Sequence, residues 1–398
     1  MATVVEFWGV GMAVGSVLPM TTGDISSHLL ADWVPSLPAA VGSSFIGWPP
    51  FLLEVANFNG NDVLALRAEA GRTERQWKSV LSWMLGVADT RHVLASEGYR
   101  WIAPLSAFYP GAVQPVDLSA WHPSFPRSAV TVDRRPGSRC RLRPDYLALR
   151  STAQAFGPYE WAVVEAKGTQ ACLTNTRACP TAWASQARSV VVTVNGVRIA
   201  IPRHLVVATR VNPNAAYPST RRIQVRAWNR RDEPEESRVP SEAMVDIAAA
   251  HLFGMFRGLR LRDNALAMAV SVQARTEARM GNVSESTRVH ANNISERAEI
   301  ELRERTQRTT QPDGRMATVI SVDTELGAIS VEVAEPVISL ARSFRRAEAP
   351  DIAAAALREA DAQLDAWEAS RRTATRQRGN VVLPFGVEVR LSSDFELR

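Results

Sequence analysis

Two short stretches of the sequence decide which fold we expect. Residues 143–149 read Arg-Pro-Asp-Tyr-Leu-Ala-Leu, and residues 161–168 read Trp-Ala-Val-Val-Glu-Ala-Lys-Gly. Each contains an apolar run of strand length with polar residues at one end. Because side chains alternate between the two faces of a strand, Glu165 and Lys167 share one face, about 7 Å apart. The pattern therefore predicts two strands, with reactive groups at the end of the second.

The connection between these strands brings another acidic residue to the same end. Residues 150–160 are few enough for a hairpin that folds Asp145 back beside Glu165. Two neighbouring carboxylates repel each other unless something neutralises them. Magnesium is commonly held by one or two carboxylates together with waters and substrate phosphate oxygens. The amine of Lys167 would then orient or deprotonate an attacking water, or offset charge on a phosphorane.

The composition draws attention to the same lysine. Of the 46 basic residues, only Lys78 and Lys167 are lysines, which leaves 44 arginines. Arginine can replace lysine on most solvated surface, so a retained amine marks a place that needs a compact charge with an adjustable pKa. The alternative interpretation is an exposed Glu-x-Lys ion pair, worth roughly a few tenths of a kcal/mol. Pro-Asp is also a common turn dipeptide.

Together, the two motifs resemble those of the PD-(D/E)xK nuclease superfamily, also called restriction-endonuclease-like. Pro144-Asp145 is similar to its PD element, and Glu165-Ala166-Lys167 is similar to its ExK element. The resemblance implies that Asp145, Glu165 and the backbone carbonyl of Ala166 bind Mg²⁺ or Mn²⁺. It implies that Lys167 is the catalytic amine. It further implies a mixed sheet, with one helix before the motif hairpin and another after it.

The resemblance also implicates residues from the two neighbouring helices. The superfamily often adds an acidic residue from the preceding helix, for which Glu74 is the candidate and Glu97 the alternative. Some members add a glutamine from the following helix, and Gln186 occupies that place. A glutamate in a first helical turn also complements the helix dipole, and Gln186 would equally suit a solvated amide. The helicase-fused exonuclease branch has a tyrosine where this chain has Val190, so no branch is identified.

Arginine clusters flank the motif. One cluster leads directly into the Pro-Asp dipeptide, and the other accompanies a strand near residue 226. Such side chains hold phosphate backbones, and the contact weakens with salt. The alternative is ordinary solvated surface in an arginine-rich chain, whose net charge is only +5. The candidate nucleic-acid contacts are Arg139, Arg141, Arg143, Arg222 and Arg226.

The rest of the chain is expected to fold around this hairpin as an α/β protein, of the α+β type with a mixed sheet. We expect an N-terminal segment of unknown role at residues 1–71 and a restriction-endonuclease-like core at 72–260. A polar helical arm or linker follows at 261–314, and a C-terminal α+β domain at 315–398.

Local patterns predict the elements within these parts. Asn195-Gly196, between two valine-rich runs, is the strongest short hairpin signal in the chain. Residues 106–137 hold many prolines and are expected to form a loop. Helical spacing is present at 73–97, 181–189, 241–260 and from about 350 to 378. Further strands are expected at 99–105, 204–211, 222–228, 316–322, 328–333 and 381–391.

We therefore expect a magnesium-dependent endonuclease that hydrolyses phosphodiester bonds in DNA. The resemblance implies a role in restriction or phage defence, with a homo-oligomer or a defence-system protein as further partner. Three alternatives stay open: a non-catalytic nucleic-acid-binding or assembly protein with this fold, an RNA nuclease or antibacterial nuclease toxin, and a metal-dependent hydrolase acting on a small phosphorylated substrate.

Other features exclude several classes of protein. The three cysteines form no C-x-x-C pair, and their odd number argues against a disulfide framework, which predicts a cytoplasmic protein. No stretch is long and apolar enough to be a membrane helix, so no membrane partner is expected. The six histidines lack zinc-ligand spacing, and the chain has neither a P-loop nor a Rossmann glycine motif.

Overall fold

The structure is a computed structural model of the 398-residue chain. Within the residues that it describes, the protein is a mixed α/β structure built on a six-stranded mixed sheet and a five-stranded sheet. None of the helices in these residues is both long and apolar enough to cross a membrane. The described residues are 5–9, 56–59, 63–66, 75–110, 128–151, 159–169, 179–201, 203–211, 223–231, 239–281, 283–310, 316–324, 327–346, 349–375, 381–383 and 386–391.

The six-stranded sheet contains both predicted motif strands at neighbouring positions. Its strands, in spatial order, are β1 (Val5–Gly9), β11 (Ile223–Arg231), β10 (Arg203–Val211), β7 (Tyr159–Thr169), β6 (Tyr146–Ser151) and β4 (Trp101–Pro104). β6 and β7 form the expected antiparallel hairpin. β7 runs parallel to β10, and β10 runs antiparallel to β11, so the sheet is mixed.

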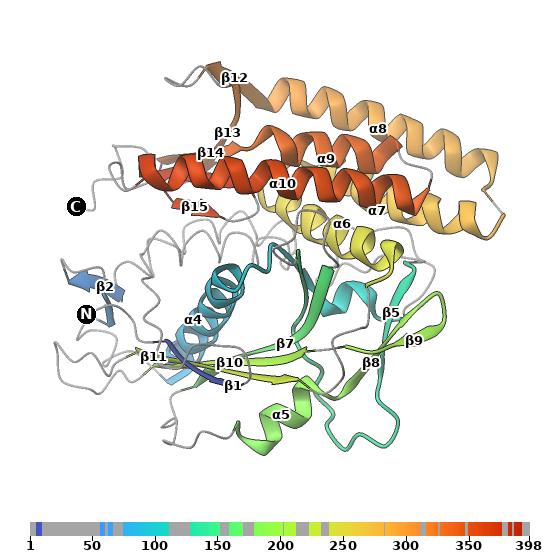
Figure 1. Ribbon diagram of the computed structural model, residues 1–398. Helices are drawn as coiled ribbons and strands as arrows, with labels where there is room; N and C mark the ends of the chain where they lie inside the picture. The colour runs from blue at the N-terminus through green and yellow to red at the C-terminus, as the bar shows by residue number, and fades with distance from the viewer. Residues whose placement is uncertain are drawn as a thin grey trace.

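Two helices cover opposite faces of this sheet. α4 (Arg75–Ser96) packs on β7 and β10 from one side, and α5 (Thr181–Ala187) packs on the same strands from the other (Figure 1). A small sheet of β5 (Val130–Arg134), β8 (Val190–Val194) and β9 (Val197–Ile199) lies beside them, next to the 3₁₀ helix η2 (Leu105–Phe108). The β8–β9 hairpin is confirmed: Asn195 and Gly196 adopt φ angles of 54° and 78°, the left-handed turn conformation that this dipeptide favours.

The C-terminal half forms a second layer of helices and a second sheet. α6 (Ser241–Gly258) packs against β4 and β6, and α7 (Arg262–Arg279) packs between α6 and α8 (Glu285–Arg305). α9 (Glu335–Arg346) and α10 (Pro350–Thr375) complete the layer, which lies over the first sheet in Figure 1. The second sheet has the order β12 (Thr306–Thr310), β13 (Met316–Thr324), β14 (Gly327–Val333), β16 (Val387–Leu391), β15 (Val381–Leu383). A separate hairpin joins β2 (Ala56–Asn59) to β3 (Val63–Leu66).

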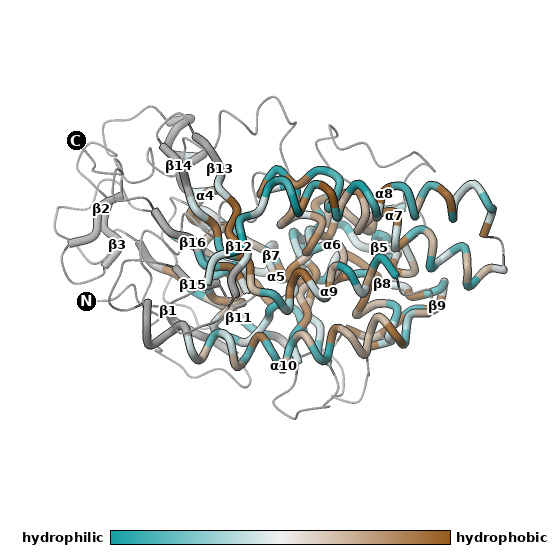
Figure 2. The backbone as a smooth tube through the Cα atoms, turned by 90° about the horizontal axis from the view of Figure 1, so that it is seen from above, coloured by the Kyte–Doolittle hydropathy of each residue, from teal (hydrophilic) through white to brown (hydrophobic). Residues whose placement is uncertain are grey.

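One continuous hydrophobic core joins the two halves. It runs from Trp161 in β7 through Phe253 in α6 to Phe344 in α9 and Leu357 in α10, all nearly or fully buried. Figure 2 shows the hydrophobic α6 in the middle of the molecule and the mostly hydrophilic α8 on the outside. A core shared in this way means that the two halves stabilise each other.

A buried ionic cluster strengthens the same junction. Arg100, which precedes β4, donates to three acids of α10: Asp361 at 2.8 Å, Asp365 at 2.6 Å and Glu368 at 3.0 Å. The Tyr159 hydroxyl also donates to Asp361. Burial alone would lower the pKa of Arg100, but the carboxylates raise it above its usual value, so the guanidinium stays charged. Removing Arg100 would take this cation away from the two buried carboxylates, Asp361 and Glu368.

Several elements differ from the sequence-based expectations. The predicted mixture of helices and strands with a mixed sheet is confirmed and is compatible with the α+β type. The region expected as a loop at 106–137, however, contains part of η2 and β5. The prediction of a polar helical arm or linker at 261–314 fits the exposed face of α8 but does not fit α7. Residues of α7 such as Met268 and Val272 are buried, and its polar Asn264 and Arg275 are buried with partners inside the protein. Polar composition misled the prediction because these groups are satisfied internally.

The closest contact between α4 and the sheet is made by two glycines. A Cβ at Gly168 in β7 would lie 1.9 Å from the carbonyl oxygen of Ser82 in α4. A Cβ at Gly86 in α4 would lie 2.7 Å from the Gly168 nitrogen. Helix and strand backbones therefore touch directly, at the residue that follows Lys167.

We expect Gly168→Ala to destabilise the protein by about 3 kcal/mol or more, because the methyl group can fit only if α4 moves off the sheet. Gly137→Ala is the control, since a Cβ there has open space around it and must only tolerate a φ of +76°, a cost of roughly 1–2 kcal/mol. Thermal and denaturant unfolding measure both variants. Equal losses of stability would show that the helix–strand contact is not tight.

Candidate active site

The β6–β7 hairpin fixes Asp145 at the end where the two motifs meet. Asp145 precedes β6, and its backbone N–H donates to the carbonyl of Val164 at 3.0 Å. Its side-chain Oδ2 accepts from the backbone N–H of Ala166 at 2.8 Å. Its own carbonyl accepts from the N–H of Leu105 at 2.8 Å. These bonds hold the aspartate beside the Glu165-Ala166-Lys167 segment, as the sequence predicted.

Glu165 is a buried carboxyl group with an incomplete set of partners. It is only 1% exposed, and its Oε1 forms an ion pair with Lys167 Nζ. Its Oε2 is buried and meets no hydrogen-bond donor in the described part of the chain. The pKa of Glu165 is raised to about 9, mainly by burial and also by the charge of the neighbouring Asp145, while Lys167 acts to lower it. A buried carboxyl group of this kind carries a proton at neutral pH unless a cation replaces the proton.

A short chain of hydrogen bonds positions Lys167. Its Nζ donates to Gln186 Oε1 at 2.8 Å, and Gln186 Nε2 donates to the carbonyl of Arg143 at 2.9 Å. Gln186 comes from α5, whose Ala187 packs against Val206 on the same sheet face as Glu165. The lysine side chain is 21% exposed and that of Glu165 only 1%, so the lysine is the more accessible member of the pair.

Tyr109 and Arg143 line the same end of the hairpin. The Arg143 guanidinium lies over the Tyr109 ring, 4.0 Å from its centroid. Burial raises the pKa of Tyr109; Arg143 lowers it, and the charges of Asp145 and Glu165 raise it. The tyrosine is therefore within electrostatic reach of both carboxyl groups. Sequence reasoning missed it because Tyr109 lies 36 residues before Asp145 in a segment expected to be a loop.

The residues present fit a hard divalent cation. Asp145 and Glu165 supply oxygen ligands, and the Oε2 of Glu165 accepts no hydrogen bond from the residues that the structure describes. Among the described residues, no group of three or more His, Cys, Asp or Glu is gathered as a metal site. Two carboxylates with waters match magnesium, which retains several waters, better than zinc or calcium. The part assigned to the Ala166 carbonyl stays a prediction.

The remaining predicted site residues either lie outside the described residues or lie at different places around the first sheet. Glu74 and Arg222 fall outside the described residues. Glu97 lies near Arg150, 4.0 Å from its guanidinium, at the opposite end of the hairpin from Asp145. Arg226 in β11 is 3% exposed and lies on the same sheet face as Lys167, because both residues are aligned with Ala208 of β10.

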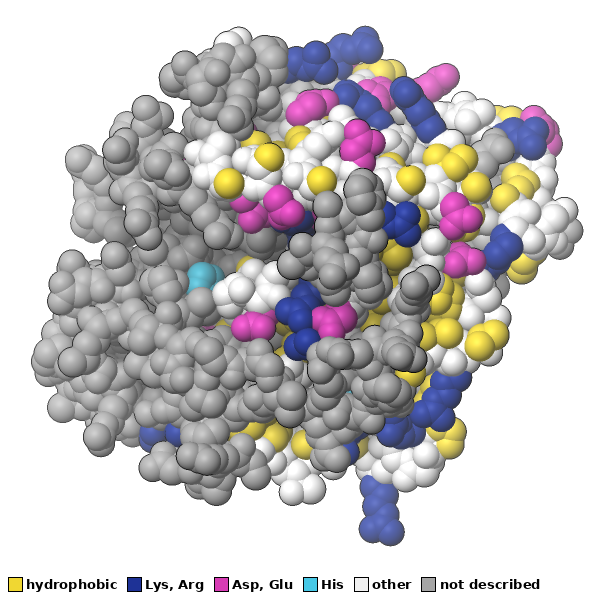
Figure 3. All heavy atoms as spheres, in the orientation of Figure 1, with side chains coloured by type: hydrophobic (Ala, Val, Ile, Leu, Met, Phe, Trp, Pro, Cys, Tyr) yellow, Lys and Arg dark blue, Asp and Glu magenta, His cyan; other side chains and the backbone are white. Residues whose placement is uncertain are grey.

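Arg139 and Arg141 are exposed in the connection between β5 and β6. Figure 3 shows basic side chains along the lower right edge of the face, where Figure 1 draws this connection and β8. This connection ends at Arg143 and Asp145. The two exposed arginines therefore belong to the segment that leads into the candidate site.

Comparison with known proteins gives no relative for this chain. No family model, curated protein or solved structure matches it. The candidate site is therefore interpreted from its own residues.

The raised pKa of Glu165 predicts how stability depends on pH. Unfolding returns this carboxyl group to its ordinary pKa, so the unfolded chain releases the proton first as the pH rises. The free energy of unfolding of the wild type should then fall, relative to that of Glu165→Gln, by up to about 1.4 kcal/mol per pH unit between roughly pH 5 and pH 9. Unfolding by denaturant at several pH values, without divalent cations, measures the difference.

Glu160→Gln is the matched control, because its effect on stability should depend on pH in the opposite direction. Burial raises the pKa of Glu160, but its bonds with Arg150 and Arg203 lower it below the usual value overall. Glu160→Gln should therefore cost stability at neutral pH, and the cost should fade as the pH drops below about 4. If Glu165→Gln behaved like Glu160→Gln, the proposed protonation of Glu165 would be wrong.

Proposed function

We propose that this protein is a magnesium-dependent nuclease with a restriction-endonuclease-like core. The observation that carries the proposal is the meeting of three side chains, Asp145, Glu165 and Lys167, at one end of the β6–β7 hairpin. Their order along the chain and their position on the hairpin match what the resemblance to the PD-(D/E)xK superfamily implies. The mixed sheet, with α4 before the hairpin and α5 after it, supports the same assignment.

The residues divide the chemistry of phosphodiester hydrolysis among them. Asp145 and Glu165 would hold Mg²⁺, which lowers the pKa of a bound water and stabilises charge on the phosphoryl oxygens. Because its pKa is about 9, Glu165 would have to release a proton to solvent in order to serve as a ligand. Lys167, held by Gln186, is the group that orients or deprotonates the attacking water. Gln186 acts as a positioning residue.

The electrostatic surroundings support a polyanionic substrate. The exposed Arg139 and Arg141 belong to the segment that ends at Arg143 and Asp145, so a bound phosphate backbone could run from them toward the site. We propose DNA as the substrate and restriction or phage defence as the context, because the resemblance implies both. An RNA substrate is tested by the same assay with a different polymer.

Each of Asp145→Asn, Glu165→Gln and Lys167→Met should slow cleavage of plasmid DNA by about a hundredfold or more, since each removes a group that acts in the transition state. The wild type should nick or cut the plasmid in Mg²⁺ or Mn²⁺, and EDTA should stop it. Gel analysis of supercoiled DNA over time measures the rates. Glu285→Gln, an exposed carboxylate on α8, is the control and should cut like the wild type.

The outcomes separate the proposal from its alternatives. Undiminished cleavage by the three site variants would remove this site from the reaction. DNA binding by the wild type without cleavage in either metal would favour the non-catalytic binding protein. Cleavage of RNA in place of DNA would favour the ribonuclease or toxin alternative.

The double variant Arg139→Ala/Arg141→Ala should bind DNA more weakly and with less dependence on salt. Each phosphate contact contributes about 0.9 to the slope of log affinity against log salt, so the slope should become less steep by about 2. Fluorescence anisotropy at several salt concentrations, in the absence of divalent cations, measures it. Arg262→Ala/Arg279→Ala on α7 removes the same charge elsewhere and should change the slope much less. Equal slopes for the two double variants would show that Arg139 and Arg141 do not contact phosphate.

A further inference from the structure

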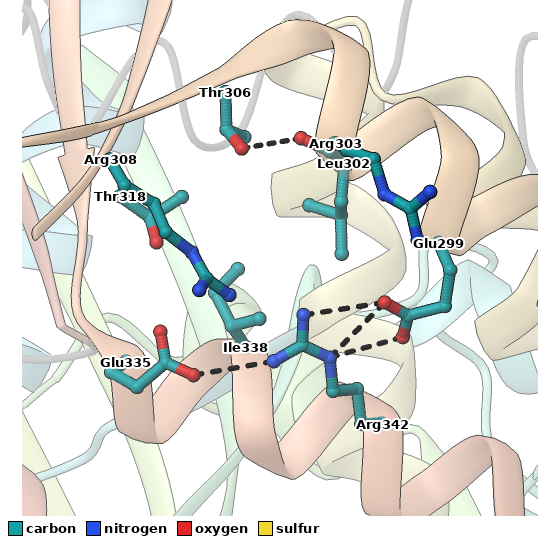
Figure 4. A pocket seen from close by; sticks show the side chains of 9 residues that line it. All are labelled: Glu299, Leu302, Arg303, Thr306, Arg308, Thr318, Glu335, Ile338 and Arg342. Carbon is teal, nitrogen blue, oxygen red and sulfur yellow. Dashed lines mark hydrogen bonds and ion pairs between the residues drawn. The ribbon is translucent and has the colours of Figure 1, made fainter.

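A polar cavity lies in the C-terminal half and contains none of the hairpin-site residues. It has a volume of about 420 Å³ and is lined by residues of α8, β12, β13 and α9 (Figure 4). This volume falls within the range of small-molecule sites. Its lining residues are Glu299, Leu302, Arg303, Thr306, Arg308, Thr318, Glu335, Ile338 and Arg342.

Three arginines from three different elements meet around the cavity. Arg303 comes from α8, Arg308 from β12 and Arg342 from α9. Figure 4 shows Arg308 reaching into the space from one side, with Arg342 below it and Arg303 on the opposite side. Guanidinium groups that converge from separate elements create a concentrated positive charge, which needs an anionic partner.

The acidic residues of the cavity are already occupied. Glu299 accepts from Arg342 Nε at 3.0 Å and is also paired with Arg345 behind the cavity. Glu335 accepts from Arg342 Nη1 at 3.3 Å. Burial raises the pKa of Glu299, but Arg342 and Arg345 lower it below its usual value, so the carboxylate stays ionised and paired. Both acids therefore serve to hold Arg342 in place.

The other two arginines have no such partners. Arg303 and Arg308 are exposed, and neither forms a hydrogen bond or an ion pair with any described residue. Both guanidinium groups line the cavity and are open to solvent, so they are available to an anionic ligand. Arginine binds phosphate through pairs of parallel N–H donors, which makes it the preferred residue for this anion.

The inner wall of the cavity is different in character. Leu302 and Ile338 are buried and apolar, and Thr318 beside them is also buried. A ligand that fits this arrangement has an anionic group for the arginines and a less polar body for the wall. From this geometry we propose that the cavity binds a small molecule carrying a phosphate monoester, of up to about mononucleotide size. The proposal does not depend on the hairpin site being catalytic.

AMP and inorganic phosphate are the probes, and adenosine is the uncharged control. In isothermal titration calorimetry with the full chain and EDTA, AMP should bind with a Kd of about 0.1 mM or tighter, phosphate should bind more weakly, and adenosine should not bind. Arg303→Ala and Arg308→Ala should each weaken AMP binding about tenfold, the scale of one charge-assisted hydrogen bond. Neither substitution removes a hydrogen bond or an ion pair between described residues, so both variants should unfold much like the wild type.

Arg305→Ala is the matched control, because Arg305 is exposed at the end of the same helix but does not line the cavity. It should bind AMP like the wild type. No heat of binding with either AMP or phosphate at millimolar concentration would overturn the proposal. Unchanged affinity in both Arg303→Ala and Arg308→Ala would overturn it as well.

A 5′-phosphorylated oligonucleotide identifies the source of the phosphate group. If the cavity takes a free small molecule, the oligonucleotide should not compete with AMP better than its unphosphorylated form does. Competition that requires the 5′-phosphate would show instead that the cavity binds the phosphorylated end of a nucleic acid. Because these measurements contain no divalent cation, their result is independent of any cleavage at Glu165.

Discussion

The backbone contact between Gly86 of α4 and Gly168 of β7 is the constraint on which the candidate site depends. It brings the helix against one face of β7 immediately after Lys167. The opposite face is left for α5, which supplies Gln186 to the lysine amine. A side chain at either glycine would push the helix away from the strand and would disturb the register that places Lys167. Gly168 is therefore explained by the close approach of the α4 and β7 backbones, which leaves no room for a side chain.

The electrostatics of the site follow from where this packing places Glu165. The carboxyl group is almost fully covered and lies beside Asp145, and one of its oxygens has no donor within the described parts of the chain. The only cation paired with it is the amine of Lys167, among the residues that the structure describes. One amine cannot neutralise two carboxylates, so the site is satisfied either by a proton or by an added cation. This incomplete neutralisation is the physical link between the fold and the proposed metal-dependent chemistry.

Local signals in the sequence were sufficient to predict the hairpin and the positions of its acidic residues. The apolar run at the start of 161–168 and the Asn195-Gly196 turn predicted strands that the structure contains. The position of Asp145 also followed, since a hairpin leaves few alternatives for the residue before its first strand. Tyr109 was not predictable, because its approach to Asp145 depends on tertiary packing of η2. α9 was missed although Pro336 and the spacing of Val337, Leu340 and Ala341 favour a helix.

Buried polar contacts connect the C-terminal helices to the part of the chain that carries Gln186. Arg275 of α7 donates to the carbonyl of Phe344 in α9 at 2.8 Å, and its charge acts on Asp246 of α6. Asp246 in turn accepts from the N–H of Ala129, at the start of β5, at 2.8 Å. β5 pairs with β8, which begins three residues after α5 ends. Each of these groups would lose a buried partner if its neighbour moved, and that penalty opposes separation of α9, α7, α6 and β5.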